Sequence, residues 1–264
     1  MAEPEAHADG TRPTRVLVLL HAFPVGVDVW HPQLHAFPEW RVFVPPLPGF
    51  DGSDPIDEPS VDAYAARVVH ELASAGVTKA VIAGLSLGGY VALAIHRAHP
   101  ALVSGLILAD TRSTADSADA LKARRHMLEM LDTGGPSAIA DDVLPKLLGV
   151  TTRREHPEVV ARCRERILQQ PAAAIAGAVR AMMTRPDATP GLARIDVPTL
   201  VIVGDEDTIT PPAEAEALQR GISGARLARI PRAGHLSSVE NRAAFNAAVS
   251  EFLDTVCRDS DLRG

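Results

Sequence analysis

Residues 80–89 read AVIAGLSLGG and run into the helix-forming stretch YVALAIHRA at residues 90–98. An apolar strand, a Gly-x-Ser-x-Gly turn and a helix, in that order, are typical of a nucleophile elbow. A serine hydroxyl is a poor nucleophile at neutral pH, so such a turn holds Ser86 out of the sheet where a base can take its proton. Gly84 and Gly88 let strand and helix approach closely. The amino end of the helix offers N–H groups to a developing negative charge.

Similar apolar runs lie on both sides of this elbow. Each is followed by Gly, Pro or Asp and then by a helical pattern, which is typical of a parallel sheet with helices on both faces. The predicted strands are Arg15–Leu20, Arg41–Val44, Ala80–Gly84, Gly105–Asp110, Thr199–Gly204 and Arg226–Ile230. The predicted helices are Val61–Ala75, Gly88–Ala98, Ala213–Gln219 and Ala243–Val256. We therefore predict an α/β fold with a mostly parallel sheet of about six strands.

The alternation stops between residues 112 and 188, where no strand-like run occurs. Amphipathic helical stretches follow one another there, separated by GGP, TTRREHP, QQP and RPDATP. A helical insertion at the carboxyl end of a strand commonly covers a binding crevice. We predict a core of residues 1–111 and 189–264, with residues 112–188 as a helical cap. The alternative is a second helical layer with no gating role.

Two further loops follow strands on the carboxyl edge of the predicted sheet. One begins after residue 204 and contains Asp207, and the other begins after residue 230 and contains His235. The carboxyl ends of parallel strands open on one edge, so these side chains should converge on Ser86. The chain order Ser, acid, His is that of a catalytic triad. We assign His235 as general base and Asp207 as the acid that orients it.

Several acids compete for the orienting role. Asp205 and Glu206 lie too close to the end of the strand, whereas Asp207 lies far enough into the loop to reach back over the sheet edge. Asp110, at the carboxyl end of the preceding strand, is the reserve. All of them can also be explained as turn residues, because Asp commonly begins and caps loops.

A third loop, LHAFP at residues 20–24, also follows a strand. An oxyanion hole needs two N–H groups aimed at one point, and we assign the backbone N–H groups of Phe23 and Leu87 to it. His21 is expected to brace this loop by a hydrogen bond rather than to act as a second base.

The segments around these loops are HAFPVGVDVW, PPLPGFDGSD, GLSLGGYVALAIHRAHP, ADTRS, VPTLVIVGDEDTITPP and AGHLSSVEN. With them the chain resembles the α/β-hydrolase fold superfamily, and in particular its small-cap bacterial esterases and lactonases, which include 3-oxoadipate enol-lactonases. The resemblance runs from residue 16 almost to the end of the chain. It implies a cofactor-free serine hydrolase.

The chain departs from that family in two places. Ala22 stands where members usually have Gly, and Ala tolerates a positive φ poorly, so the oxyanion loop is expected to differ in its backbone. Larger members begin with a β-hairpin, but only about fourteen residues precede the first parallel strand here. We expect that hairpin to be reduced or absent.

These features predict a carboxylic ester hydrolase, an esterase or lactonase that forms an acyl-enzyme on Ser86. Perhydrolases, haloperoxidase-like enzymes and C–C bond hydrolases use the same triad. A receptor that binds a small ligand without turnover is a further alternative, because function does not follow from fold alone.

The substrate pocket is predicted to be aliphatic. Aromatic residues make up 4% of the chain, too few for the stacking platforms that sugars usually need, and the flexible Met side chains of the cap would adapt to a small acyl group. The residues predicted to line it are Phe23, Trp30, Met127, Met130, Leu131, Met183 and Leu236.

Composition excludes several other classes. The 264 residues are 46% hydrophobic and 22% charged, which excludes a coiled coil, a collagen and a disordered chain. A net charge of -7 argues against a nucleic-acid partner. The GxGxxG and GxxxxGK[ST] motifs of dinucleotide and P-loop sites do not occur.

No metal site or membrane association is expected. Cys163 and Cys257 show no CxxC spacing, and the pair His31 and His35 has no third ligand beside it. The first residues lack the pattern of a secretory signal, and no apolar run is long enough to span a bilayer. We therefore expect a cytoplasmic protein, a monomer or homodimer.

Overall fold

The computed structural model describes residues 15–261 and contains one six-stranded sheet. Every neighbouring pair of strands is parallel, in the order β2-β1-β3-β4-β5-β6. The strands are β1 (Val16–Leu20), β2 (Arg41–Phe43), β3 (Ala80–Leu85), β4 (Val103–Ala109), β5 (Thr199–Gly204) and β6 (Arg226–Ile230). The prediction of about six strands is confirmed, and the sheet is wholly rather than mostly parallel.

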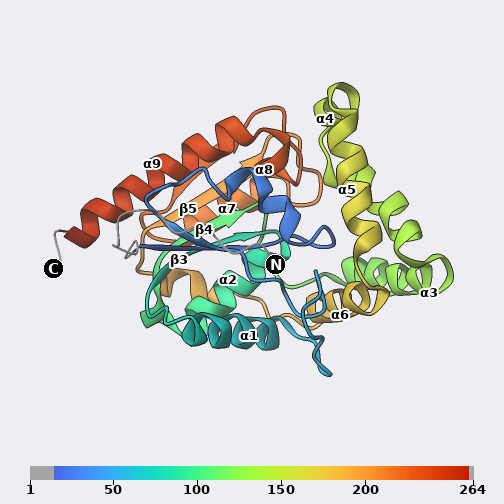
Figure 1. Ribbon diagram of the computed structural model, residues 1–264, viewed down its shortest axis with the longest axis horizontal. Helices are drawn as coiled ribbons and strands as arrows, with labels where there is room; N and C mark the ends of the chain where they lie inside the picture. The colour runs from blue at the N-terminus through green and yellow to red at the C-terminus, as the bar shows by residue number, and fades with distance from the viewer. Residues whose placement is uncertain (1–14, 262–264) are drawn as a thin grey trace.

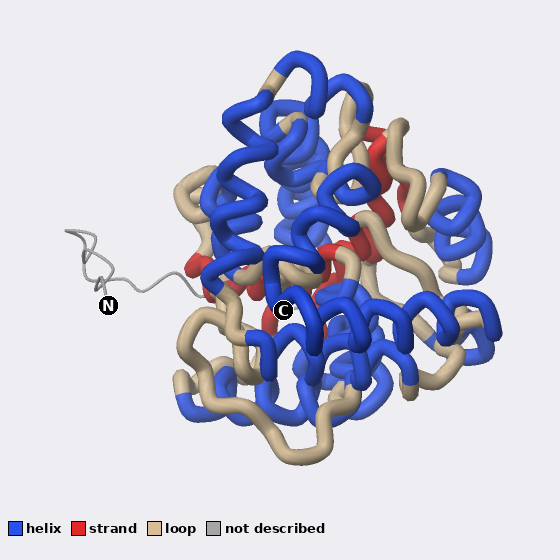
Figure 2. The backbone as a smooth tube through the Cα atoms, turned by 90° about the vertical axis from the view of Figure 1, so that its right-hand side faces the viewer, coloured by secondary structure: helices blue, strands red, loops and turns tan. Residues whose placement is uncertain are grey.

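Helices cover both faces of the sheet, as the apolar strands require. β1, β3 and β5 are buried along their whole length, whereas the edge strands β2 and β6 are half-buried or exposed at most positions. In Figure 1, α1 (Val61–Ser74) and α2 (Leu87–Ala98) lie on one face and α9 (Arg242–Asp261) on the other. Figure 2 shows the strands inside this layer of helices.

The remaining core elements are short. α7 (Pro212–Gly221) packs on β5 and β6, and α8 (Ser237–Glu240) contacts the 3₁₀ helix η1 (Val27–Gln33). Two further 3₁₀ helices are η2 (Pro100–Leu102) and η3 (Thr189–Arg194).

The chain between β4 and β5 is helical, as predicted. It forms α3 (Ala118–Leu147), α4 (Val150–Glu155), α5 (Pro157–Gln169) and α6 (Ala172–Met183), which gather at one side of the sheet in Figure 1. α3 is interrupted at Gly135, where φ is 63°, within the predicted GGP break.

One predicted connector in this region is wrong. Most of TTRREHP is helix α4 rather than a linker. Its first turn is held by a tertiary contact, because the Glu206 carboxylate accepts hydrogen bonds from the Thr151 N–H (2.8 Å) and hydroxyl (2.5 Å). The helix ends at Glu155, two residues before Pro157 begins the next one.

The chain enters and leaves the inserted helices side by side. The Ala188 N–H donates to the Ser113 carbonyl, and the hydroxyls of Ser113 and Thr189 lie 2.9 Å apart. Beside them, the buried ion pair of Arg185 with Asp116 spans 2.7 Å. These contacts lie next to the predicted boundaries of the cap, and the division into cap and core stays a prediction.

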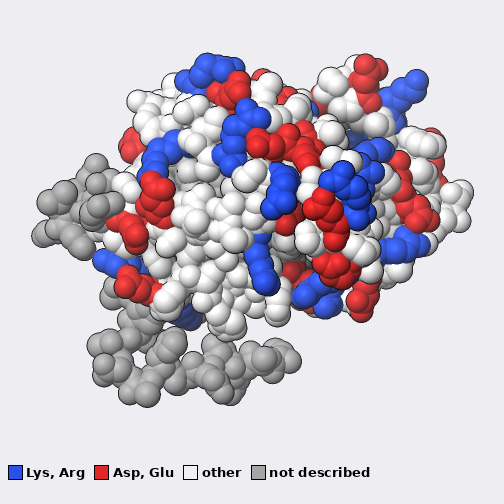
Figure 3. Space-filling view, turned by 90° about the horizontal axis from the view of Figure 1, so that it is seen from above, with Lys and Arg blue, Asp and Glu red and all other residues white. Residues whose placement is uncertain are grey.

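Three points concern the start of the chain, membrane spans and the surface charge. An N-terminal hairpin would fall before residue 15, outside the described residues. Among the helices of residues 15–261, none is both long and apolar enough to cross a bilayer. On the face shown in Figure 3, basic and acidic side chains are interleaved without a continuous field of one sign.

The close approach of β1, β3 and α2 gives a test of the elbow. A Cβ added at Gly88 would collide with the Leu20 carbonyl, so we expect Gly88→Ala to lower the free energy of unfolding by about 1–3 kcal/mol. Gly177 lies inside α6, and a Cβ there would meet its nearest atom at an ordinary 3.4 Å. Gly177→Ala should therefore raise stability by about 0.5–1 kcal/mol. Urea unfolding measures both, and a Gly88→Ala protein as stable as the wild type would contradict the packing.

Candidate active site

Ser86 occupies a constrained turn between β3 and α2. Its φ of 54° and ψ of -111° put a non-glycine residue at positive φ, a conformation that costs about 1–3 kcal/mol and persists only where surrounding contacts enforce it. Those contacts are present. The Ser86 N–H donates to the Ala109 carbonyl at 2.9 Å, and the Thr111 hydroxyl donates to the Ser86 carbonyl at 2.9 Å.

Two hydrogen bonds in series join the Ser86 hydroxyl to an acid. His235 Nε2 lies 2.7 Å from Ser86 Oγ, and His235 Nδ1 lies 2.8 Å from Asp207 Oδ2. A carboxylate only accepts, so the imidazole proton belongs on Nδ1 and the free lone pair on Nε2 faces the serine hydroxyl. The structure thus brings together the three side chains that the sequence placed on separate loops.

Thr210 supports this arrangement and was missed in the sequence. Its hydroxyl donates to Asp207 Oδ2 at 2.7 Å and lies 3.1 Å from His235 Nδ1. Asp207 Oδ1 accepts from the N–H groups of Ile209 and Thr210, at 2.8 and 3.0 Å. An Asp three residues before a Thr in a Pro-flanked loop is the signal that could have revealed this turn.

The electrostatic balance favours an ionised Asp207. Burial by itself would raise its pKa, but the charge and hydrogen bond of His235, followed by the Thr210 hydrogen bonds, outweigh it. The pKa of Asp207 therefore lies below its ordinary value. An anion at this point stabilises the imidazolium that forms when His235 takes a proton.

The competing acids have other partners. Asp205 forms an ion pair with Arg229 on β6, and Glu206 holds the start of α4. Asp110 is fully buried and accepts hydrogen bonds from the Gly204 N–H and from Ser237, 2.8 and 2.5 Å away respectively. Burial, and then the negative charge of Asp207, raise the pKa of Asp110 well above its ordinary value. The contacts of Asp110 thus join β5 to the loop after His235.

The backbone N–H groups of Phe23 and Leu87 are assigned to an oxyanion hole. Neither has a hydrogen-bond partner among residues 15–261. Leu87 is the first residue of α2. Ala22 is not among the described non-glycine residues with positive φ, and the expected difference of this loop from the family stays a prediction. His21 accepts from the Leu47 N–H at 3.0 Å and donates to the Ala22 carbonyl, and burial lowers its pKa.

The predicted pocket residues fall into two groups. Phe23, Trp30, Leu131 and Leu236 are buried, and the Trp30 ring packs against Phe245 of α9. The other three predicted residues, Met127, Met130 and Met183, are half-buried and pack against the core from the inserted helices. Their role in binding a substrate stays a prediction.

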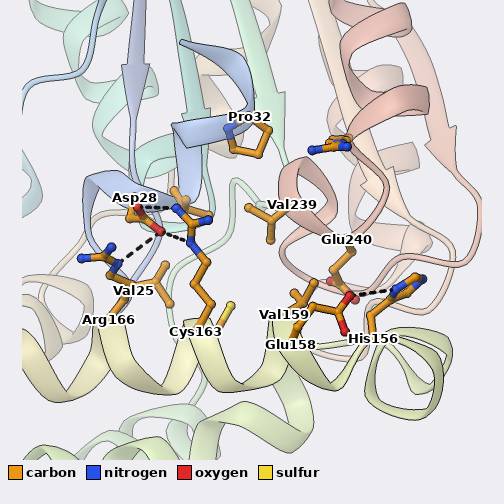
Figure 4. Close-up of a pocket in the computed structure, with 13 residues that line it drawn as sticks. Val25, Asp28, Pro32, His156, Glu158, Val159, Cys163, Arg166, Val239 and Glu240 are labelled. Atoms are coloured by element: carbon orange, nitrogen blue, oxygen red, sulfur yellow. Dashed lines mark hydrogen bonds and ion pairs between the residues drawn. The ribbon is translucent and has the colours of Figure 1, made fainter.

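A hollow of about 410 Å³ lies between η1, α5 and the end of α8. Figure 4 shows Asp28 facing α5, where Arg162 and Arg166 bind its carboxylate at 2.8 and 3.3 Å. Cys163 also lines this hollow, and burial raises the pKa of its thiol to about 12. It therefore stays protonated at neutral pH and is a poor nucleophile. In the described part of the chain no three His, Cys, Asp or Glu side chains group as a metal site.

Comparison with known proteins gives matches along most of the chain. A family model described as the alpha/beta hydrolase fold matches residues 15–242. A thermophilic esterase from Thermogutta terrifontis, solved with malate bound, is 38% identical with a TM-score of 0.88, covering 92% of this chain and 90% of that one. 3-Oxoadipate enol-lactonase 2 of Acinetobacter baylyi is 27% identical over 88% of this chain and 86% of the lactonase. Polyketide synthase ThaQ of Burkholderia thailandensis is 33% identical over 85% of this chain, which spans 11% of the synthase.

The opposite pKa shifts of Asp110 and Asp207 predict opposite dependences of stability on pH. Above the ordinary aspartate pKa of about 3.9, folded Asp110 still binds a proton that the unfolded chain has released. The stability of the wild type relative to Asp110→Asn should therefore fall as the pH rises from about 4 to the raised pKa. The stability of the wild type relative to Asp207→Asn should fall as the pH drops below about 4, because the pKa of folded Asp207 is lowered.

Urea unfolding across a pH series measures both differences. The two variants should show pH dependences of opposite sign. A wild-type advantage over Asp110→Asn that grew with pH would contradict a raised pKa for Asp110.

Proposed function

The chain belongs to the alpha/beta hydrolase fold family, and on that basis we propose that it is a serine hydrolase that cleaves small carboxylic esters or lactones. The observation that carries the proposal is the hydrogen-bonded series from Ser86 through His235 to Asp207, with spans of 2.7 and 2.8 Å. The similarity to an esterase and to an enol-lactonase supports the substrate class. Both kinds of substrate present a carbonyl carbon bonded to an oxygen leaving group.

In the first half of the proposed reaction, Ser86 Oγ attacks the carbonyl carbon and its proton passes to His235 Nε2. The carbonyl oxygen becomes an oxyanion, and the N–H groups of Phe23 and Leu87 are proposed to donate to it. The bond to the leaving oxygen then breaks as His235 returns the proton to that oxygen. An ester releases its alcohol, whereas the opened lactone keeps its hydroxyl on the acyl chain.

In the second half, water attacks the acyl-enzyme. His235 takes a proton from the water, and a second oxyanion forms at the same place. Its collapse breaks the bond to Ser86 Oγ, which recovers a proton from His235, and the carboxylic acid leaves. Asp207 holds the imidazole in the productive tautomer through both halves and stays ionised.

The proposal also covers the domain organisation, the cellular location and the oligomeric state. Residues 112–188 form a cap over the site, and the hydrogen bond from the His235 N–H to the Leu147 carbonyl of α3 supports their closeness to it. The expected cytoplasmic location and the monomer or homodimer state belong to the same proposal. Size-exclusion chromatography with light scattering measures the oligomeric state.

A fluorophosphonate probe tests the reaction class. Because the probe reacts only with an activated serine, the wild type should be labelled and should hydrolyse short p-nitrophenyl esters or simple lactones. Ser86→Ala should lose labelling and at least about 10³-fold in kcat. A folded wild type that neither labels nor cleaves any member of an ester and lactone panel would refute the proposal.

The assignment of the acid has its own test. Asp207→Asn keeps the shape of the side chain but no longer favours the productive tautomer, so kcat should fall by about 10³–10⁴-fold. Asp205→Asn alters the neighbouring acid, whose partner is Arg229, and should stay within about twofold of the wild type. Steady-state kinetics on one ester measures both. If Asp207→Asn stayed active while Asp110→Asn did not, the orienting role would pass to Asp110.

A further inference from the structure

The end of α3 and the start of α4 lie against both loops that carry the site. We call residues 147–151 of the inserted region the cap segment. The His235 N–H donates to the Leu147 carbonyl at 2.9 Å. This is a direct backbone contact between the cap segment and the residue whose imidazole binds the Ser86 hydroxyl. Two carboxylates that the proposed reaction does not use also form hydrogen bonds to the cap segment.

Glu240 links the cap segment to the loop that carries His235. One carboxylate oxygen, Oε2, accepts from the Gly149 N–H at 2.7 Å, and the other, Oε1, accepts from the Leu236 N–H at 3.0 Å. Leu236 directly follows His235 in the chain. A single side chain therefore joins the cap segment to the peptide unit next to the imidazole.

Glu206 makes the corresponding link to the acid loop. Both of its carboxylate oxygens bind Thr151, one through the N–H at 2.8 Å and the other through the hydroxyl at 2.5 Å. Its own N–H donates to the Ala233 carbonyl at 2.8 Å, so it also touches the His235 loop. Glu206 directly precedes Asp207 in the chain.

The packing between these segments leaves no room for a shift toward one another. A Cβ added at Gly234 would collide with the Gly149 N–H, and one added at Gly149 would lie 2.8 Å from the Gly234 nitrogen. Two glycines thus allow the backbones to touch. The carboxylates of Glu206 and Glu240 add hydrogen bonds across the same contact.

We propose that Glu206 and Glu240 are positioning residues that couple the position of the cap segment to the geometry of the His235–Asp207 pair. This inference rests on the proposed function, because it assigns a purpose to the alignment of that pair. Neither carboxylate touches the Ser86 hydroxyl. They act by fixing the backbone adjacent to His235 and Asp207.

The hydrogen bonds predict different responses to the same substitution. Each Glu240 oxygen accepts from a backbone N–H, so Glu240→Gln must place its NH₂ group against one of those donors. In Glu206→Gln the carbonyl oxygen can accept from the Thr151 N–H, and the NH₂ can donate to the Thr151 hydroxyl oxygen once that hydroxyl rotates. The carboxamide is therefore tolerated at 206 and not at 240.

The experiment measures kcat, KM and the fluorophosphonate labelling rate on one p-nitrophenyl ester, with melting temperatures recorded for each protein. Glu240→Gln should lower kcat and the labelling rate by about tenfold, with KM within about twofold. Glu206→Ala should lower kcat about fivefold to tenfold, and Glu206→Gln should restore it to within about twofold of the wild type. Glu129→Gln, an exposed change on α3, is the matched control and should match the wild type.

Wild-type kcat and labelling in both Glu240→Gln and Glu206→Ala would overturn the inference while leaving the proposed function intact. So would equal losses in Glu206→Ala and Glu206→Gln, because the hydroxyl-assisted rescue is specific to the contacts described. If Glu240→Gln fails to fold, the Glu206 pair decides the question alone. A wild type that neither labels nor cleaves would refute the proposed function itself.

Discussion

The contact between β3 and α2 at Ser86 is the constraint on which the rest of the site depends. The turn there is possible because Gly84 and Gly88 lack side chains that would collide with neighbouring backbone, and because Ser86 is held by bonds to β4 and Thr111. Its positive φ is therefore maintained by the glycines of the turn together with the contacts to β4 and Thr111. With the hydroxyl fixed above the carboxyl edge of the sheet, every other group of the site needs only to reach that point.

The acidic side chains in and around the site have different partners and different pKa shifts because their surroundings differ. Asp207 faces His235 and hydrogen-bond donors, and its pKa is lowered. Asp110, buried beside the negative charge of Asp207, has a raised pKa and joins β5 to the His235 loop. Glu206 and Glu240 bind backbone N–H groups of the inserted helices. One carboxylate thus faces the imidazole, while the neighbouring acids bind backbone N–H groups and a serine of the surrounding loops.

The inserted helices contact the core at several places, and two of these differ in their relation to the site. At one, the two segments that connect the inserted helices to the core lie side by side near Ser113 and Thr189. The Arg185–Asp116 ion pair lies beside them. At the other, residues 147–151 rest against the His235 loop. Only the second of these contacts lies on the loop that carries His235. The proposed coupling between the inserted helices and the His235–Asp207 pair has its structural basis there.

The amino-acid sequence by itself determined the sheet, the helical insertion and the convergence of Ser86, His235 and an acid, because strand periodicity and chain order fix which loops share an edge. It did not determine that residues 150–155 are helical, or that Glu206 and Glu240 bind the N–H groups of Thr151 and Gly149. Those outcomes depend on hydrogen bonds between residues up to about ninety positions apart, such as Gly149 with Glu240. No local pattern records such a bond, since its energy exists only once tertiary packing has brought donor and acceptor within reach.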